Sequence, residues 1–213
     1  MMSGLLLLGI LALSYALGSV PVGLIVAGLK TGRDLRATGS GKTGATNVMR
    51  SAGRKWGFLT LFLDGAKAFI AVICATLLWR LSPMSIGPIG LDVPIVQSLS
   101  GVAAIIGHNH PMFAGFRGGR GVSSFFGSMV FLNWPVALLG IGVLTVVAMV
   151  SRFMSLASIV AGLVTCAAMV ALYAVGRAPL PHTAYAVLVV AYIVFVHRDN
   201  ISRLRKGTER KLF

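Results

Sequence analysis

The sequence predicts an all-α integral membrane protein of seven transmembrane helices, with the N-terminus outside and the C-terminus in the cytoplasm. Hydrophobic residues make up 56% of its 213 residues and charged residues 11%, and the mean hydropathy is +0.88. A soluble domain carries about 25% charged residues, and a chain of this size has too little interior to hide such an apolar excess. The apolar stretches are continuous instead of alternating, which indicates helices and excludes a barrel. Cys74 and Cys166 both lie in apolar runs, so a disulfide framework or a zinc cage is also excluded.

Seven apolar runs are the candidate spans, and two short central ones are separated by Asn133-Trp134-Pro135. Proline has no N–H donor and restricts the residue before it, so a helix breaks there. The first run is long enough to cross a bilayer with some tilt. The runs cover residues 4–29, 56–79, 93–108, 122–134, 135–150, 155–175 and 183–196.

The basic residues set the orientation. Lys and Arg number 19 against 5 Asp and Glu, for a net charge of +14. Seven spans place the basic clusters in residues 30–55 and 198–211 on one side, whereas six spans would separate them, so the positive-inside rule favours seven. The first run lacks a basic segment before it and continues past Pro21, so we expect a span and not a cleaved secretory signal. We expect residues 1–213 to form a single membrane-embedded domain.

Residues 18–23 and 32–50 have the composition of a phosphate-binding segment. Glycines at 39, 41 and 44 let the backbone bend and bring N–H groups close to a ligand, among hydroxyl, amide and basic side chains. We expect Thr46 and Asn47 to cap the helix that follows and to make its N-terminus an anion site. The spacing of a nucleotide P-loop is absent. The alternative is a flexible basic loop at the lipid headgroups.

Residues 107–124 repeat this pattern around Arg120. Gly118, Gly119 and Gly121 predict a tight turn that presents backbone amides beside a guanidinium able to bind phosphate through two bonds. His108 and His110 do not share a helix face, and no carboxylate or thiolate lies near them in the sequence. We therefore expect no metal site here, and a structural hydrogen bond for His108 at a helix end.

Residues 197–211 form the third polar stretch. His197 and Asn200 share a face if this segment is helical. A tail that binds anionic lipid would explain the basic residues after position 204 but not this pair, so both interpretations stay open.

Asp64 and Lys67 are ionisable residues inside the second apolar run. At positions i and i+3 they can pair on one helix face, which limits the cost of burial. A functional role and a structural pair that points into the bundle are both open.

The three polar stretches together resemble the signatures of the bacterial acyl-phosphate:glycerol-3-phosphate acyltransferase family, over nearly the whole chain. The first resembles Gly-Ser-x-Pro-x-Gly followed by Gly-x-Asp-x-Arg-x-x-Gly-Ser-Gly-Asn-x-Gly-Ala-Thr-Asn-x-x-Arg. The second resembles Gly-His-x-x-Pro-x-Phe-x-x-Phe-x-Gly-Gly-Lys-Gly-Val, and the third His-Arg-x-Asn-Ile-x-Arg-Leu. Lys42 replaces the usual Asn and Arg120 the usual Lys, and both keep or add positive charge.

The resemblance implies an enzyme of the bacterial cytoplasmic membrane whose active site faces the cytoplasm. It would transfer a fatty acyl group from acyl phosphate to the 1-hydroxyl of glycerol 3-phosphate, giving lysophosphatidic acid and phosphate, as the first step of phospholipid synthesis. It implies no cofactor, contact with membrane lipids but not nucleic acid, and a functional link to the acyl-phosphate-forming and second-step acyltransferases. Carried over by position, it assigns catalytic roles to His197, Asn200 and Arg120. It assigns substrate and phosphate binding to Ser40, Gly41, Thr46, Asn47, Arg50, Gly118, Gly119, Gly121 and Arg203.

The chemistry of acyl phosphate favours direct transfer. It is a mixed anhydride with a good leaving group, so a covalent acyl-enzyme is not required. We expect the glycerol hydroxyl to attack directly while the enzyme supplies positioning and charge stabilisation. Two rival functions remain: a transporter would place the basic residues near the bilayer midplane, and a lipid-binding scaffold would need the basic tail but not the glycine-rich stretches.

Overall fold

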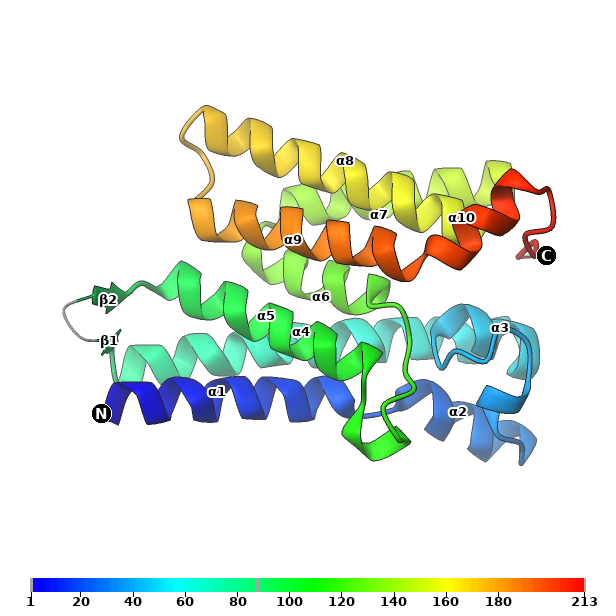
Figure 1. Ribbon diagram of the computed structural model, residues 1–213, viewed down its shortest axis with the longest axis horizontal. Coiled ribbons are helices and arrows are strands. Elements are labelled where there is room, and N and C mark those ends of the chain that lie inside the picture. Colours follow the sequence, from blue (N-terminus) through cyan, green and yellow to red (C-terminus); the bar gives the residue numbers. More distant parts are fainter. Residues whose placement is uncertain (1, 87–88, 213) are drawn as a thin grey trace. The chain divides into compact units, whose positions relative to one another are not determined.

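The computed structural model describes residues 2–86 and 89–212 and divides into two compact units, Met1–Leu132 (unit 1) and Asn133–Phe213 (unit 2). Helices dominate both units, as Figure 1 shows, so the predicted helical fold is confirmed. That the whole chain is one domain stays a prediction.

Unit 1 is a bundle in which α4 packs against α1, α5 and α6, and α1 packs along α5 (Figure 1). A short hairpin, β1 paired antiparallel with β2, joins α4 to α5 and is the small departure from an all-α fold. Its elements are α1 (Met2–Ser19), α2 (Val22–Thr31), η1 (Leu35–Ala37), α3 (Ala45–Ala52), α4 (Arg54–Leu81), β1 (Met84–Ile86), β2 (Ile89–Leu91), α5 (Val93–Asn109), η2 (Met112–Ala114) and α6 (Val122–Leu132).

The first apolar run forms two helices, not one. α1 ends at Ser19 and α2 begins at Val22, so the break falls at Val20 and Pro21. Proline cannot donate the helical hydrogen bond and disfavours helical geometry in the residue before it. The break places the polar segment that follows α2 at one end of the unit.

Unit 2 is an antiparallel arrangement in which α8 packs against both α7 and α9. The side chain of Asn133 caps α7 by accepting a hydrogen bond from the Val136 N–H at 3.3 Å, and Pro135 stands in the first turn. The predicted break between the two short central runs is therefore confirmed. The elements are α7 (Trp134–Ser151), α8 (Met154–Ala174), α9 (Leu180–Val196) and α10 (Arg198–Arg205).

Helices occupy all seven apolar runs, but they differ in length. Four helical segments among the described residues are long and apolar enough to cross a membrane: 3–31, 54–81, 134–151 and 154–174. The pair α9 and α10, bent by 57°, would make a fifth. α5 and α6 are shorter, at 17 and 11 residues. The count of seven spans and the orientation therefore stay predictions.

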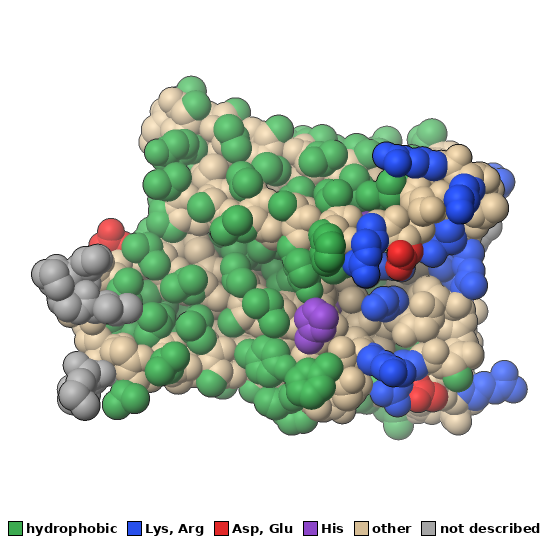
Figure 2. Space-filling view, viewed as in Figure 1, with side chains coloured by type: hydrophobic (Ala, Val, Ile, Leu, Met, Phe, Trp, Pro, Cys, Tyr) green, Lys and Arg blue, Asp and Glu red, His purple; other side chains and the backbone are tan. Residues whose placement is uncertain are grey.

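The surface of each unit separates into an apolar part and a basic end. Large hydrophobic side chains are exposed along the helices, as in Phe62 at 69% and Leu188 at 65%, which suits contact with lipid. In Figure 2, the Lys and Arg side chains of unit 1 gather at the end that carries α2 and α3, and those of unit 2 at the end that carries α10. Both predicted phosphate-binding stretches of unit 1 belong to its basic end.

Candidate active site

Asn47 holds the first glycine-rich loop, residues 32–44, from the inside. Its side chain is buried, at 2% exposure. The Nδ2 group donates to the carbonyl oxygens of Leu35 and Thr38, both at 3.1 Å, and of Lys42 at 2.9 Å. The Oδ1 atom accepts the N–H of Ser40 at 3.3 Å. One buried amide therefore fixes the path of the whole loop.

The expected helix cap at Thr46 and Asn47 is wrong. α3 begins after Gly44 and has no side-chain capping bond. The Asn47 amide is already committed to the loop, and a separate short helix, α3, stands between the loop and the long α4.

The second glycine-rich loop, residues 110–121, folds back onto the C-terminal end of α5. The Gly118 N–H donates to the Asn109 carbonyl and the Gly119 N–H to the His108 carbonyl, both at 3.1 Å. A Cβ on Gly118 would collide with the His108 carbonyl, and one on Gly119 with the His108 ring. Glycine is thus required for close packing. These two amides are used within the fold, which differs from the expected presentation of both to phosphate.

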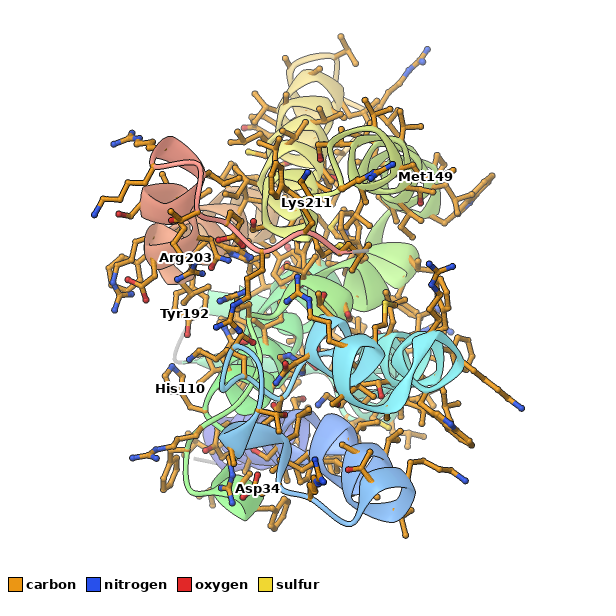
Figure 3. The ribbon with its side chains drawn as sticks, turned by 90° about the vertical axis from the view of Figure 1, so that its right-hand side faces the viewer. Asp34, His110, Met149, Tyr192, Arg203 and Lys211 are labelled. Carbon is orange, nitrogen blue, oxygen red and sulfur yellow. The ribbon has the colours of Figure 1, made fainter. Side chains whose placement is uncertain are left out.

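The two loops contact each other. The Thr43 N–H donates to the Gly118 carbonyl at 3.4 Å, and Arg36 Nη1 donates to the Ala114 carbonyl at 3.2 Å. Arg36 also forms an ion pair with Asp34 at 2.7 Å, and its hydrogen bonds to that carboxylate hold the pKa of Asp34 below its usual value. Figure 3 labels Asp34, in the first loop, and His110, at the start of the second.

The structure brings the predicted residues of the first two motifs to this end of unit 1. Arg120 is half-buried and directly precedes Gly121, which has φ +81°, and the first turn of α6. The first N–H groups of a helix have no acceptor within it, so a guanidinium beside such a turn favours an anion. Ser40 and Thr46 are half-buried, and Gly41 and Arg50 are exposed.

Asn109 is a residue that the motif reasoning did not single out. It is 5% exposed, and neither atom of its side-chain amide has a hydrogen-bond partner among the described residues. The amide lies against Gly121, where a Cβ would be 3.2 Å from Oδ1 and 3.4 Å from Nδ2. A buried polar group left without a partner costs about 1–3 kcal/mol. The signal in the sequence is an amide at the end of an apolar helix, directly before a glycine-rich turn.

Asp64 and Lys67 form the predicted pair, with Lys67 Nζ 2.9 Å from Asp64 Oδ1. The expected placement of His108 near a helix end is also confirmed, since α5 ends at Asn109. The partner of His108 was not foreseen: its Nδ1 lies 3.3 Å from the same Asp64 oxygen. Asp64 and His108 are far apart in the sequence, so no local spacing could have linked them.

The third motif lies in unit 2, around the turn from α9 to α10. His197 and Asn200 are buried, at 2% and 3% exposure. The Nδ1 atom of His197 is 2.7 Å from the Ile193 carbonyl oxygen. Because a carbonyl oxygen only accepts, this contact places the proton on Nδ1 and makes Nε2 the acceptor of the neutral ring.

Glu209 anchors the third motif and was missed by the sequence reasoning. Its carboxylate accepts hydrogen bonds from Asn200 Nδ2 at 2.7 Å, Ser155 Oγ at 2.9 Å and Arg203 Nε at 2.8 Å. Burial raises the pKa of Glu209, but these three donors outweigh it and leave the pKa below its usual value. The Leu212 N–H donates to the Arg152 carbonyl at 2.7 Å, which holds the tail in place. Figure 3 labels Arg203 on α10 and Lys211 in this tail.

The lipid-binding interpretation of the basic tail stays open. A surface hollow is lined by Arg198, Ile201, Ser202, Arg205 and Lys206. These residues differ from His197 and Asn200, which are buried.

Among the residues that the structure describes, no group of three or more His, Cys, Asp or Glu side chains could hold a metal ion.

Comparison with known proteins identifies relatives along almost the whole chain. Residues 8–207 match the family model described as glycerol-3-phosphate acyltransferase. Glycerol-3-phosphate acyltransferase 3 of Dehalococcoides mccartyi is 42% identical over 206 residues, which cover 97% of this chain and 95% of the relative. The glycerol-3-phosphate acyltransferase of Jannaschia sp. is 41% identical over 209 residues, covering 97% and 94%.

Two crystal structures of PlsY (YgiH), an integral membrane glycerol 3-phosphate acyltransferase, are also similar. The glycerol 3-phosphate form has a TM-score of 0.82 and 35% identity, and the lysophosphatidic acid form 0.79 and 33%. Both comparisons cover 96% of this chain and 94% of the other. The resemblance drawn from the three motifs and the predicted integral membrane class are confirmed.

Proposed function

This chain belongs to the glycerol-3-phosphate acyltransferase family, and from that premise we propose that it acylates the 1-hydroxyl of glycerol 3-phosphate with acyl phosphate as the donor. The products are lysophosphatidic acid and inorganic phosphate. The solved structures of PlsY (YgiH) include a glycerol 3-phosphate form and a lysophosphatidic acid form, which supports this acceptor and this product.

One observation carries the proposal: two glycine-rich loops that contact each other at the basic end of unit 1. The contact runs from the Thr43 N–H to the Gly118 carbonyl, and Arg120 stands beside it at the start of α6. Both proposed substrates carry a phosphate, which guanidinium groups and helix N-termini bind well. A transporter would instead need its basic residues near the bilayer midplane. The Lys and Arg side chains of unit 1 gather at the end of the unit that carries α2 and α3 (Figure 2).

In the proposed reaction, the glycerol 1-hydroxyl oxygen attacks the acyl carbonyl carbon. The new ester C–O bond forms, the C–O bond to phosphate breaks, and the leaving phosphate takes the hydroxyl proton. Arg120 and Arg50 would bind phosphate charge, together with Ser40, Gly41, Thr46 and the loops that contain Asn47, Gly118, Gly119 and Gly121. His197 and Asn200, with Arg203, would orient glycerol 3-phosphate.

We propose the bacterial cytoplasmic membrane as the location, with the substrate-binding loops facing the cytoplasm. The relatives are bacterial and the solved ones are integral membrane proteins. An enzyme that makes acyl phosphate would then supply the donor, and a second acyltransferase would consume the product. Cysteines placed one at a time at positions 40, 120 and 200 should react with an impermeant thiol reagent from the same side of the membrane. Labelling from opposite sides would contradict this orientation.

An assay of the purified protein in detergent tests the reaction. Acyl phosphate with labelled glycerol 3-phosphate should give labelled lysophosphatidic acid and one phosphate per product, while acyl-CoA should give none. Arg120→Ala should raise the KM of at least one phosphate substrate by about tenfold, which corresponds to 1.4 kcal/mol. Arg120→Lys keeps the positive charge and introduces the residue usual in the family's second motif, so it should keep that KM within about threefold. Acyl transfer from acyl-CoA alone would overturn the proposed donor, and unchanged kinetics of Arg120→Ala would remove Arg120 from the site.

A further inference from the structure

Asp64, Lys67 and His108 form a triad of ionisable side chains inside unit 1, here called the buried triad. Their exposures are 2%, 8% and 6%. One oxygen, Asp64 Oδ1, lies 2.9 Å from Lys67 Nζ and 3.3 Å from His108 Nδ1. Of the five acidic residues in the chain, Asp64 is the one within an apolar helix.

Stability alone does not account for such a triad. Buried ion pairs pay a desolvation cost that is often not repaid, and apolar residues of similar volume frequently serve the fold as well. Inside a lipid-embedded bundle, ionisable residues are expensive and are generally functional. The contacts of each member show what the buried triad holds.

Lys67 reaches the segment that carries the first glycine-rich loop. Its Nζ donates to the Val20 carbonyl at 2.8 Å, in the break between α1 and α2. Beyond this break, Gly23 packs so closely on the backbone of Thr43 that a Cβ would collide with the Thr43 carbonyl. A shift at Val20 is therefore transmitted through α2 to the first loop.

His108 reaches the second glycine-rich loop. Its carbonyl accepts the Gly119 N–H at 3.1 Å, and its ring lies against Gly119, one residue before Arg120. The Ser124 Oγ atom donates to the Asp64 carbonyl at 3.0 Å, which ties the first turn of α6 to the same place on α4. The backbone before Arg120 is therefore connected to Asp64 through His108, and the backbone after it through Ser124.

We propose that the buried triad is a positioning element for the acyltransferase site, which sets the placement of the two glycine-rich loops relative to each other. The inference rests on the proposed function, because its main readout is the KM of the two phosphate substrates. None of the three side chains touches substrate in this proposal. They act through the Val20 carbonyl and through the backbone and ring of His108.

The same two helices offer a matched control. Gln97 Nε2 donates to Thr76 Oγ1 at 3.0 Å, and both residues are buried. This bond joins α4 to α5 near the hairpin of β1 and β2, whereas Asp64 joins them near the loops. Loss of either contact weakens the packing of α4 on α5, but only loss of the triad should disturb the loops.

The experiment compares Asp64→Asn, His108→Leu, His108→Asn and Thr76→Val in the full-length protein. We expect Asp64→Asn and His108→Leu to raise the KM of glycerol 3-phosphate or of acyl phosphate about tenfold or more, while kcat falls less than about threefold. His108→Asn keeps an amide near the Nδ1 position and should recover most of the lost affinity. Thr76→Val should lower Tm but leave both KM values within about twofold.

Three results would overturn the proposal: unchanged KM values in Asp64→Asn and His108→Leu despite a lower Tm, an equal rise in Thr76→Val, or no recovery in His108→Asn. If Asp64→Asn does not yield folded protein, Ser124→Ala and the two His108 variants decide the question by the same criteria. The dissociation constant of glycerol 3-phosphate, measured by calorimetry, gives a readout without turnover. A wild-type protein that binds glycerol 3-phosphate but does not use acyl phosphate would refute the donor and leave the test of the triad intact.

Discussion

The two units hold their candidate site residues with chemically different anchors. In unit 1, a neutral amide, Asn47, bonds to four backbone groups of the first glycine-rich loop. In unit 2, a carboxylate, Glu209, accepts from three side chains, those of Ser155, Asn200 and Arg203. The amide fixes the path of a backbone, and the carboxylate fixes the direction of side chains.

This difference determines how each anchor can lose its hydrogen bonds. A neutral amide does not titrate, and its removal takes away its bonds to four backbone groups of the loop at once. A carboxylate binds more strongly per hydrogen bond, but protonation removes its charge. The Asn47 anchor should therefore act at every pH, while the Glu209 anchor should depend on acidity as well.

The largest effect is expected from Asn47→Ala. Loss of the amide removes the bonds that hold the Leu35, Thr38 and Lys42 carbonyls and the Ser40 N–H to one point. The loop should therefore lose its path, and the free energy of unfolding should fall by about 2 kcal/mol. We expect activity to fall about a hundredfold or more in the acyl transfer assay. Asn133→Ala is the control, since it removes a capping amide in unit 2 for about 1 kcal/mol and should leave activity largely intact. Activity close to wild type in Asn47→Ala would refute the role of the amide as an anchor.

Glu209→Ala should have the next largest effect. Asn200 and Arg203 would lose a charged acceptor, which costs about 1.5–3 kcal/mol, and the KM of glycerol 3-phosphate should rise about tenfold. Glu209→Gln retains an oxygen for Asn200 and Ser155 and should fall between wild type and Glu209→Ala. Equal kinetics for the alanine and glutamine variants would mean that the hydrogen bonds to Asn200 and Ser155 do not matter.

A smaller effect of opposite sign is expected from Asn109→Leu. The Asn109 amide has no partner among the described residues, in contrast to the Asn47 amide. An apolar side chain of similar size removes this cost of about 1 kcal/mol, so Tm should rise by about 2–4 °C. Thermal unfolding in detergent measures this change in Tm. Asn47→Leu is the matched control and should lower Tm. A fall in Tm for Asn109→Leu would show that the amide is satisfied in solution.

The smallest effect concerns pH. The pKa of Glu209 lies below its ordinary value of 4.5 in the folded protein, so the unfolded chain binds more protons near and below that pH. The stabilisation by Glu209 is therefore complete well above pH 4.5 and is lost as the pH falls through the folded-state pKa. The difference in Tm between wild type and Glu209→Gln should shrink as the pH is lowered from 7 to 4. Asp34→Asn is a control, because the pKa of the Asp34 carboxyl is also lowered, in an exposed ion pair with Arg36. A difference in Tm independent of pH would contradict the role of the charge.

The sequence by itself determined the features that depend on local order. Continuous apolar runs specify helices in lipid, Asn133 and Pro135 specify the break before α7, and the spacing of Asp64 and Lys67 specifies their pairing on one helix face. The three motifs were sufficient to indicate the family. Each of these features follows from the order of residues within a short stretch of the sequence, which is fixed before the chain folds.

Only the tertiary structure decided what the buried polar groups contact. The pairing of Asp64 with His108, the clamping of the first loop by Asn47 and the capture of Asn200 and Arg203 by Glu209 each depend on the path that the backbone takes. Hydrogen bonds act over about 3 Å, so a partner is chosen by packing and not by position in the chain. The same reason explains why Gly118 and Gly119, expected to present amides, instead serve close contact with the end of α5.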